Sequence, residues 1–150
     1  MNTNNHRKLC HKEIISIFED KNICIIGICN ENNIELMPMA YTFLEENNKI
    51  NFFFICFDSN ILVNTILKNR NISIFLDNSI SNFYTDVYQT IKVNGTAEIV
   101  TNSVKQNYIL NKFKNKYSDS LKKMDFDHNK VNYIKVSVKT ITAREHNYEV

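Results

Sequence analysis

Residues 36–76 constrain the fold most, because they combine two strand patterns, a short helix pattern and a third strand pattern in immediate succession. Residues 36–44 and 49–57 are rich in aromatic and β-branched side chains, which favour strands. The polar residues 45–48 between them predict a hairpin loop, so we expect these two strands to pair antiparallel. Residues 71–76 predict the next strand.

The helix pattern in this stretch covers residues 61–69, where apolar side chains recur at helical spacing. Asp58, Ser59 and Asn60 precede it, and all three residue types cap helix starts. The first turn of a helix leaves backbone N–H groups unpaired, so this start is a natural seat for an anion.

The rest of the chain adds three strand patterns and two amphipathic helix patterns. The helices are predicted over residues 6–20 and 104–117, and Asn102 is one of the polar residues that could cap the second. The strands are predicted over residues 23–29, 87–100 and 133–141. Gly95 interrupts the second of these strands, which suggests a β-bulge or a close backbone approach.

Six strands with helices inserted between some of them, and without a repeating βαβ pattern, predict a mainly β fold: a six-stranded antiparallel split β-barrel with flanking helices. The 150 residues suit one domain spanning residues 1–150. Gly27 and Gly95 are the only glycines. The glycine-rich motifs of dinucleotide-binding and ATP-binding proteins are therefore excluded.

Composition narrows the range of partners. The formal charge of +2 is too small to predict a nucleic-acid partner. No apolar stretch is long enough for a membrane span, and no hydrophobic signal region follows the first residues, so we expect a cytoplasmic protein. The four histidines, His6, His11, His128 and His146, are scattered along the sequence. We therefore expect no metal site.

Several segments in this order resemble one known family. They are residues 37–43 followed by 48–50, residues 66–69 before the strand at Ile72, residues 83–97, and residues 116–118. Together they are similar to the split-barrel flavoproteins related to pyridoxamine 5'-phosphate oxidase, and most of all to the nitroimidazole-resistance group. The resemblance covers nearly the whole chain.

This resemblance implies a homodimer that holds FMN near the subunit interface and acts as an oxidoreductase of the nitroreductase type. The positions implied for the flavin ring are Pro38, Met39, Ala40 and Tyr41. The ribityl chain would lie at Ile55 and Cys56, and the phosphate at Ser59, Asn60 and Leu62. Gln89 and Thr90 would approach from a later strand. The implied site therefore depends on residues from four separate segments.

The sequence departs from the family at the positions that would bind the phosphate. Ile55 stands where the group has a histidine, Leu62 where a lysine is expected, and Gln89 where an arginine is common. A phosphate normally recruits at least one cation; Lys92 and Arg144 are the cations that could replace the missing lysine. The missing lysine leaves an alternative open: a split-barrel binding or sensor protein that has lost FMN and holds haem, another planar ligand or none.

Overall fold

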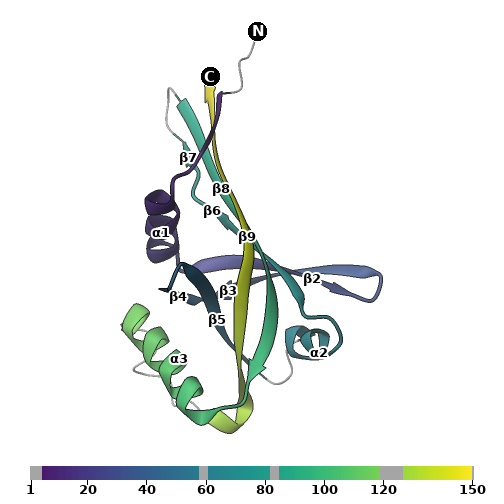
Figure 1. Ribbon diagram of the computed structural model, residues 1–150. Coiled ribbons are helices and arrows are strands. Elements are labelled where there is room, and N and C mark those ends of the chain that lie inside the picture. Colours follow the sequence, from purple (N-terminus) through teal and green to yellow (C-terminus); the bar gives the residue numbers. More distant parts are fainter. Residues whose placement is uncertain (1–4, 58–60, 82–84, 119–126, 150) are drawn as a thin grey trace.

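The chain folds around one twisted nine-stranded sheet, as a computed structural model shows (Figure 1). The structure describes residues 5–57, 61–81, 85–118 and 127–149. The strands are β1 (Asn5–Lys8), β2 (Ile23–Asn30), β3 (Asn33–Ala40), β4 (Thr42–Glu46), β5 (Lys49–Phe57), β6 (Asn71–Asp77), β7 (Ile80–Ser81), β8 (Thr85–Val100) and β9 (Val131–Glu149). The α-helices are α1 (His11–Asp20), α2 (Ile61–Lys68) and α3 (Ser103–Lys116), and a 3-10 turn covers His128–Lys130.

The sheet curls into a barrel that the chain itself closes. Its strand order is β3-β2-β6-β8-β9-β5-β4, with every pair antiparallel, while β1 pairs with β9 and β7 with β8. The two end strands, β3 and β4, follow each other in sequence and are separated only by Tyr41. The barrel is therefore split at this point, because β3 and β4 are joined by chain continuity and not by a ladder of hydrogen bonds.

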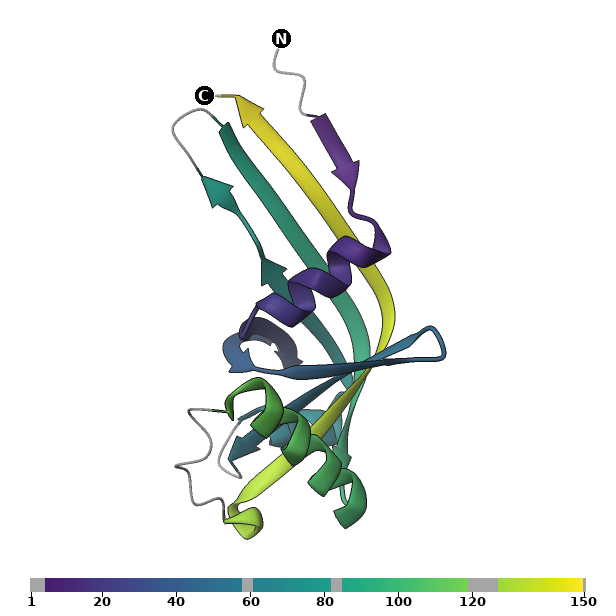
Figure 2. The ribbon, with the colours of Figure 1, turned by 90° about the vertical axis from the view of Figure 1, so that its left-hand side faces the viewer.

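Aromatic and aliphatic side chains fill the barrel interior. Phe18 from α1 packs edge-on against Phe52, and both side chains are fully buried. Leu62 from α2 is also fully buried in this cluster. The views in Figures 1 and 2 place α1 over one side of the barrel and α2 near its other end. The two helices thus contribute to the same core from different directions.

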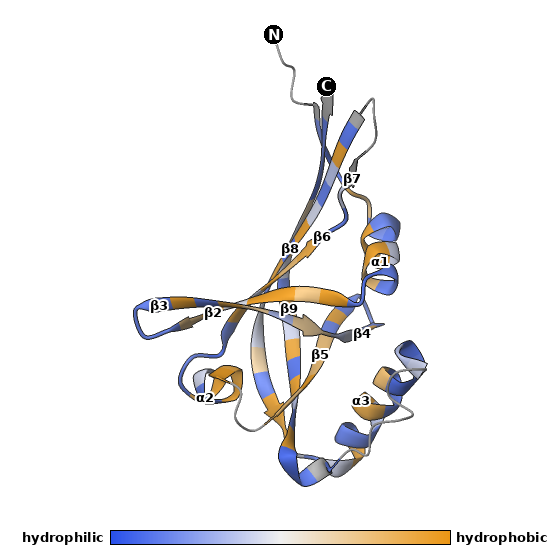
Figure 3. Cartoon of the chain, turned by 180° about the vertical axis from the view of Figure 1, so that it is seen from behind, coloured by the Kyte–Doolittle hydropathy of each residue, from blue (hydrophilic) through white to orange (hydrophobic). Residues whose placement is uncertain are grey.

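A second, smaller core lies between α3 and the sheet. Phe113 and Ile109 of α3 pack against Phe53 and Tyr133 of the neighbouring strands β5 and β9. Figure 3 shows the corresponding pattern, with apolar and polar residues interleaved along α3 and apolar residues along β5. The predicted helix and its cap are confirmed, since the Asn102 side chain accepts a hydrogen bond of 3.1 Å from the backbone N–H of Lys105.

The long strands β8 and β9 carry the bulge that the glycine predicted. Their register shifts between Asn94 and Gly95, because Asn94 pairs with Thr140 while Gly95 pairs with Val138. Lys139 is therefore the extra residue of the bulge. A Cβ atom at Gly95 would lie 2.5 Å from the Ser137 carbonyl oxygen, so only glycine fits this close approach.

The predicted hairpin of residues 36–57 is confirmed only for its second half. Thr42 to Glu46 pair with Phe53 to Lys49 around a turn in which Asn47 and Asn48 both have positive φ, a conformation that asparagine tolerates. The expectation of one continuous strand over 36–44 is wrong, because β3 pairs with β2 and the strand breaks at Tyr41. The Tyr117 hydroxyl bonds both the N–H and the carbonyl of Tyr41, and thereby satisfies backbone groups that a ladder would otherwise pair.

Two further expectations about elements are corrected. The described residues form nine strands where the sequence predicts six, because the sequence pattern predicts neither β1 nor β7 and the stretch 36–44 forms two strands. The helix predicted over 6–20 begins only at His11. Residues 5–8 pair with β9 instead, and the Glu13 carboxylate accepts hydrogen bonds from Arg7 and from the Cys10 backbone N–H, which marks the helix start.

Candidate functional site

The candidate site is the side of β3, β2, β6, β8 and β9 that points away from the barrel interior, called here the outer face. Residues that pair across these strands form rows on it. The first row runs from Pro38 through Ile25 and Phe75 to Lys92, each being the register partner of the next. Ile25 and Phe75 are each 40% exposed, although both are large and apolar. This row is therefore an apolar strip that ends in a cation.

The second row lies two residues further along the same strands. It runs from Asp77 through Thr90 and Arg144 to Lys8 on β1. Diagonal neighbours on one face of a sheet are about 7–8 Å apart, within reach of long side chains. Arg144 can therefore approach the region that Lys92 occupies.

The third row lies on the other side of the first and forms the floor of a groove. It contains Leu36, Gly27, Ser73, Asn94 and Thr140. The Ser73 hydroxyl donates a hydrogen bond of 2.8 Å to the Asn94 side-chain oxygen. The groove has a volume of about 540 Å³ and is also lined by Ile34, Lys92 and Lys139. This size is within the range of small-molecule sites.

The cations of the outer face have no carboxylate partner among the residues that the structure describes. Within the part of the chain that the structure describes, no ion pair within 4.0 Å involves Lys8, Lys92, Lys139 or Arg144. Asp77 is the acidic residue in the second row, and its carboxylate accepts hydrogen bonds from the backbone N–H and the hydroxyl of Ser79. The face thus combines exposed apolar side chains with cations that are available to an anion.

The structure brings two of the sequence-predicted site residues together on this face, Pro38 and Thr90. Four others point into the barrel core: Met39 is half-buried there, and Tyr41, Cys56 and Leu62 are fully packed. The Leu62 side chain cannot reach an exposed phosphate from this position, although its backbone N–H belongs to the first turn of α2. Ala40 and Ile55 pack against the core beneath α3. Ser59 and Asn60 lie outside the described residues.

Gln89 lies on the opposite side of β8 from Thr90, within a polar network. Its side-chain amide donates to Glu145 at 2.6 Å and accepts from Asn78 at 2.7 Å. Arg7 bonds Glu145 and also Glu13. The Arg7 guanidinium lowers the pKa of Glu13 to about 2, and hydrogen bonds from Gln89 and Arg7 lower the pKa of Glu145. The network connects β1 and α1 to the long strands, so Gln89 already has a structural role.

Tyr41 lies in a buried cluster at the split. Its hydroxyl donates to the Phe18 carbonyl at 2.8 Å, and the ammonium of Lys116 lies 3.9 Å from its ring centroid. The same ammonium donates to the carbonyls of Phe18 and Lys21 at the end of α1. Burial lowers the pKa of Lys116 to about 8 and raises that of Tyr117 to about 12. This cluster fixes the break between β3 and β4 to both α1 and α3.

Sequence reasoning did not single out the apolar members of the outer face. Ile25, Leu36 and Phe75 were assigned to strands, but the side each one faces depends on which strands become neighbours. Alternation was the available signal: Cys24 and Ile26 are buried on either side of Ile25, and Ile74 and Leu76 on either side of Phe75. Lys8 was missed because its segment was predicted to be helical.

Comparisons with known proteins identify the fold. No protein-family profile and no curated protein sequence matches the chain. Among solved structures, it is similar to a candidate 5-nitroimidazole antibiotic resistance protein from Bacteroides thetaiotaomicron, with 16% identity, a TM-score of 0.75, and coverage of 95% of this chain and 90% of that one. A FAD-binding protein from Mesorhizobium loti matches with 10% identity, a TM-score of 0.73, and coverage of 93% and 97%.

A candidate pyridoxamine 5'-phosphate oxidase from Corynebacterium glutamicum matches with 16% identity, a TM-score of 0.62, and coverage of 95% and 94%. These likenesses extend over almost the whole of each protein and agree with the resemblance seen in the sequence. The chain has the split-barrel fold of the nitroimidazole-resistance and pyridoxamine 5'-phosphate oxidase-like proteins.

Proposed function

We propose that this chain binds a flavin, FMN, on its outer face and acts as a small homodimeric oxidoreductase. The observation that carries the proposal is the first row of the outer face, where Pro38, Ile25 and Phe75 form an exposed apolar strip that ends at Lys92. A flavin has the matching chemistry, because a planar apolar ring is joined to an anionic tail. Proteins of this fold that bind flavin support the same function.

The residues present fit such a ligand despite the cation missing at Leu62. Lys92 and Arg144 can supply the charge, and charge-assisted hydrogen bonds are about twice as strong as neutral ones. Haem would require an axial ligand, which Pro38, Ile25 and Phe75 cannot supply; the candidate nearest the strip is Cys29, a free exposed thiol that lines the groove. The cations at the end of the strip match the anionic tail of a flavin, so a flavin is the better match.

The exposed strip also supports a dimer. Ile25, Leu36 and Phe75 expose 40%, 70% and 40% of their surface, and neighbouring exposed apolar side chains mark interaction sites. We propose that a second copy of the chain and the flavin cover this face together. When bound, the flavin supplies the electron or hydride chemistry. The chain's own residues then bind the phosphate, orient the ring and exclude water.

Titration of the purified chain with FMN tests the binding proposal, with quenching of flavin fluorescence as the signal. Lys92→Met and Arg144→Met should each weaken FMN binding roughly ten- to hundred-fold, since a hydrogen bond to a charged group contributes about 1.5–3 kcal/mol. Lys105→Met removes an exposed lysine on α3 and is the matched control. Equal affinity in all three variants, absent FMN binding, or a Soret band in the purified protein would each overturn the proposal.

The dimer is tested separately by light scattering after size-exclusion chromatography. Ile25→Glu places a charge in the middle of the apolar strip and should convert the dimer to a monomer. Val104→Glu is the control, because Val104 is an exposed apolar residue on α3, far from this face in sequence and 75% exposed. A monomeric native chain, or a dimer that survives Ile25→Glu, would contradict the proposed interface.

A further inference from the structure

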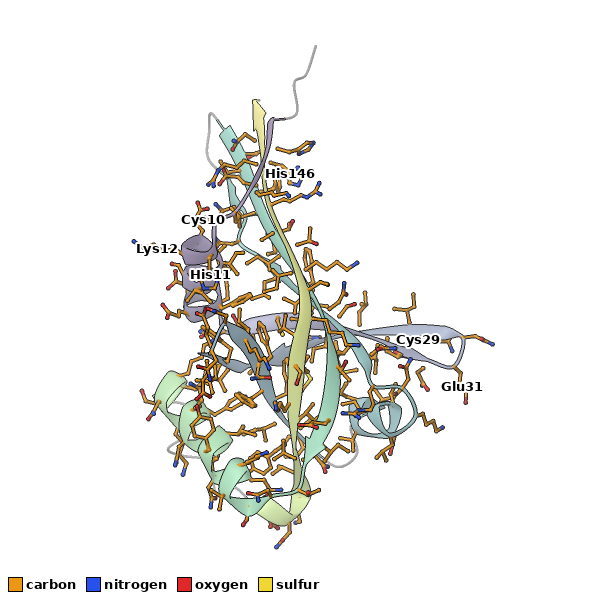
Figure 4. All side chains as sticks on the ribbon, viewed as in Figure 1. Cys10, His11, Lys12, Cys29, Glu31 and His146 are labelled. Atoms are coloured by element: carbon orange, nitrogen blue, oxygen red, sulfur yellow. The ribbon has the colours of Figure 1, made fainter. Side chains whose placement is uncertain are left out.

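Two histidines that are 140 residues apart in the sequence meet at the N-terminal strand. His6 of β1 and His146 of β9 are direct register partners, and their Nδ1 atoms contact each other. The ring centroids are 4.3 Å apart and the ring planes meet at 81°. Figure 4 shows His146 near the end of the long β8–β9 ribbon, far from the helices α2 and α3.

This pair can open into a cross-strand chelate, because a small rotation of either ring would separate the touching nitrogens and admit an ion between them. Directly opposite residues in an antiparallel pair have Cβ atoms about 4.5–5.5 Å apart, so two imidazoles can turn the same nitrogen toward one point. Imidazole nitrogen is a favoured ligand of copper, nickel and zinc. The His6 side chain is exposed and that of His146 is half-buried, so an ion can enter from solvent.

We propose that His6 and His146 bind one divalent transition-metal ion through their Nδ1 atoms, with water at the remaining positions. Within the described residues, no group of three or more histidine, cysteine, aspartate or glutamate side chains could hold a metal. The site is therefore open and weaker than a structural zinc site. The order of divalent metal affinities makes Cu²⁺ the tightest-binding probe.

The surrounding charges set a limit on the affinity. Lys8 and Arg144 form the next pair on the same face, two residues along each strand, and their positive charge opposes a cation. Arg7 and Glu145 lie on the other face and are bound to each other. A bound ion would connect β1 to β9 beside that ion pair. It would therefore stabilise the attachment of the N-terminal strand, and this effect is measured without flavin, because Arg144 of the neighbouring pair belongs to the proposed flavin site.

Titration with CuCl₂ by calorimetry tests the site, in the full, tag-free chain carrying Cys10→Ser and Cys29→Ser, which remove the two exposed free thiols that Cu²⁺ would oxidise. One equivalent should bind, and His6→Asn and His146→Asn should each lower the affinity at least ten-fold. His11→Asn is the control, because His11 bonds Glu45 and not another histidine. Electron paramagnetic resonance of the copper complex should show two nitrogen ligands in the native chain.

Thermal unfolding gives a second readout, because a ligand that binds only the folded state raises Tm. Cu²⁺ should raise the Tm of the native chain and of His11→Asn. It should not raise the Tm of His6→Asn or of His146→Asn. Each variant's own Tm without metal shows that it folds. Unchanged affinity in His6→Asn and His146→Asn, or no bound equivalent in the native chain, would show that the two rings form only a hydrogen-bonded pair.

Discussion

The outward-pointing side of this sheet has two halves that differ in what covers them. Beneath α3, Phe53 and Tyr133 are 6% and 1% exposed, because Phe113 and its neighbours pack on them. On the outer face, Ile25 and Phe75 are each 40% exposed although they belong to the same sheet. The sheet therefore has one apolar patch that its own helix buries and one that no described segment covers.

Charge follows the same division. Beside the covered half, Lys135 and Arg70 both lie within 4.0 Å of the Glu98 carboxylate. On the outer face, Lys92 and Arg144 have no such partner among the described residues. Charges that already form ion pairs keep a surface soluble but are less available to a ligand. Cations without such partners, beside an apolar strip, remain available to an anionic ligand. The comparison thus supports the proposed site on the uncovered half.

The largest expected difference between the two halves comes from removing one phenylalanine from each. Phe113→Ala should cost about 3–5 kcal/mol of the free energy of unfolding, because it leaves a cavity beneath α3. Phe75→Ala should cost less than about 1 kcal/mol in dilute protein, as expected for a half-exposed side chain. Urea unfolding measures both. A Phe75→Ala loss that grows with protein concentration would show that a second copy covers the outer face, and equal losses at low concentration would contradict the division.

A smaller loss is expected where the two long strands bend. Gly95→Ala should destabilise the chain by about 2–3 kcal/mol, because its Cβ would lie 2.5 Å from the Ser137 carbonyl oxygen and 2.9 Å from a Val136 methyl carbon. Gly27→Ala is the matched control on the outer face. Its Cβ would approach the end of the flexible Leu36 side chain at 3.3 Å and lie at ordinary contact distance, 3.9 Å, from Ser73, so we expect a change within about 0.5 kcal/mol. Similar urea midpoints for the two variants would argue against a close approach at the bulge.

We expect one hydroxyl group to stabilise the split of the barrel. Tyr117→Phe removes the hydroxyl whose single proton is shared between the carbonyl oxygens of Asn22 and Tyr41, each 2.7 Å away. Leaving these groups unpaired should cost about 1–2 kcal/mol. Tyr108→Phe, on the same helix, is the control. Hydrogen exchange would locate the effect, since the amide of Tyr41 should lose protection. Unchanged exchange at Tyr41 would show that the strand break does not need the hydroxyl.

Local patterns predicted most of the fold, but they could not predict how it is assembled. Strands, helices and the bulge at Gly95 follow from alternation, capping and a glycine in a strand, which are properties of neighbouring residues. The break at Tyr41 was not predictable in this way, because the group that pairs its backbone is the hydroxyl of Tyr117, 76 residues away. The resemblance to flavoproteins indicated Pro38 and Thr90, and the strand register brought them to one face. The resemblance assigned Leu62 to the phosphate, because it stands where the family has a lysine. Its apolar side chain instead favoured burial, and it lies in the barrel core.

The weakest expected effect is a pH dependence at the buried cluster between the covered half and the barrel core. Burial lowers the pKa of Lys116 to about 8, against 10.5 ordinarily. Above pH 8 the folded chain has released a proton that the unfolded chain still holds, so stability should rise with pH from this group. Burial also raises the pKa of Cys24 from 9.0 to about 12. The Cys24 thiol ionises at lower pH in the unfolded chain than in the folded chain. Its contribution to the free energy of unfolding therefore falls above pH 9.

The urea midpoint of the native chain should therefore rise between pH 8 and pH 9 and level off or fall at higher pH. Lys116→Met should abolish the rise, because the neutral side chain has no proton to release. Lys114 is an exposed lysine two residues before Lys116 on α3, and Lys114→Met should keep the rise. If Lys116→Met retained the rise, some group other than this ammonium would be releasing the proton. A rise that is present in Lys114→Met and absent in Lys116→Met would assign the released proton to the Lys116 ammonium, which carbonyl groups and the Tyr41 ring enclose. The exposed cations of the outer face have no such enclosure and are available to a ligand.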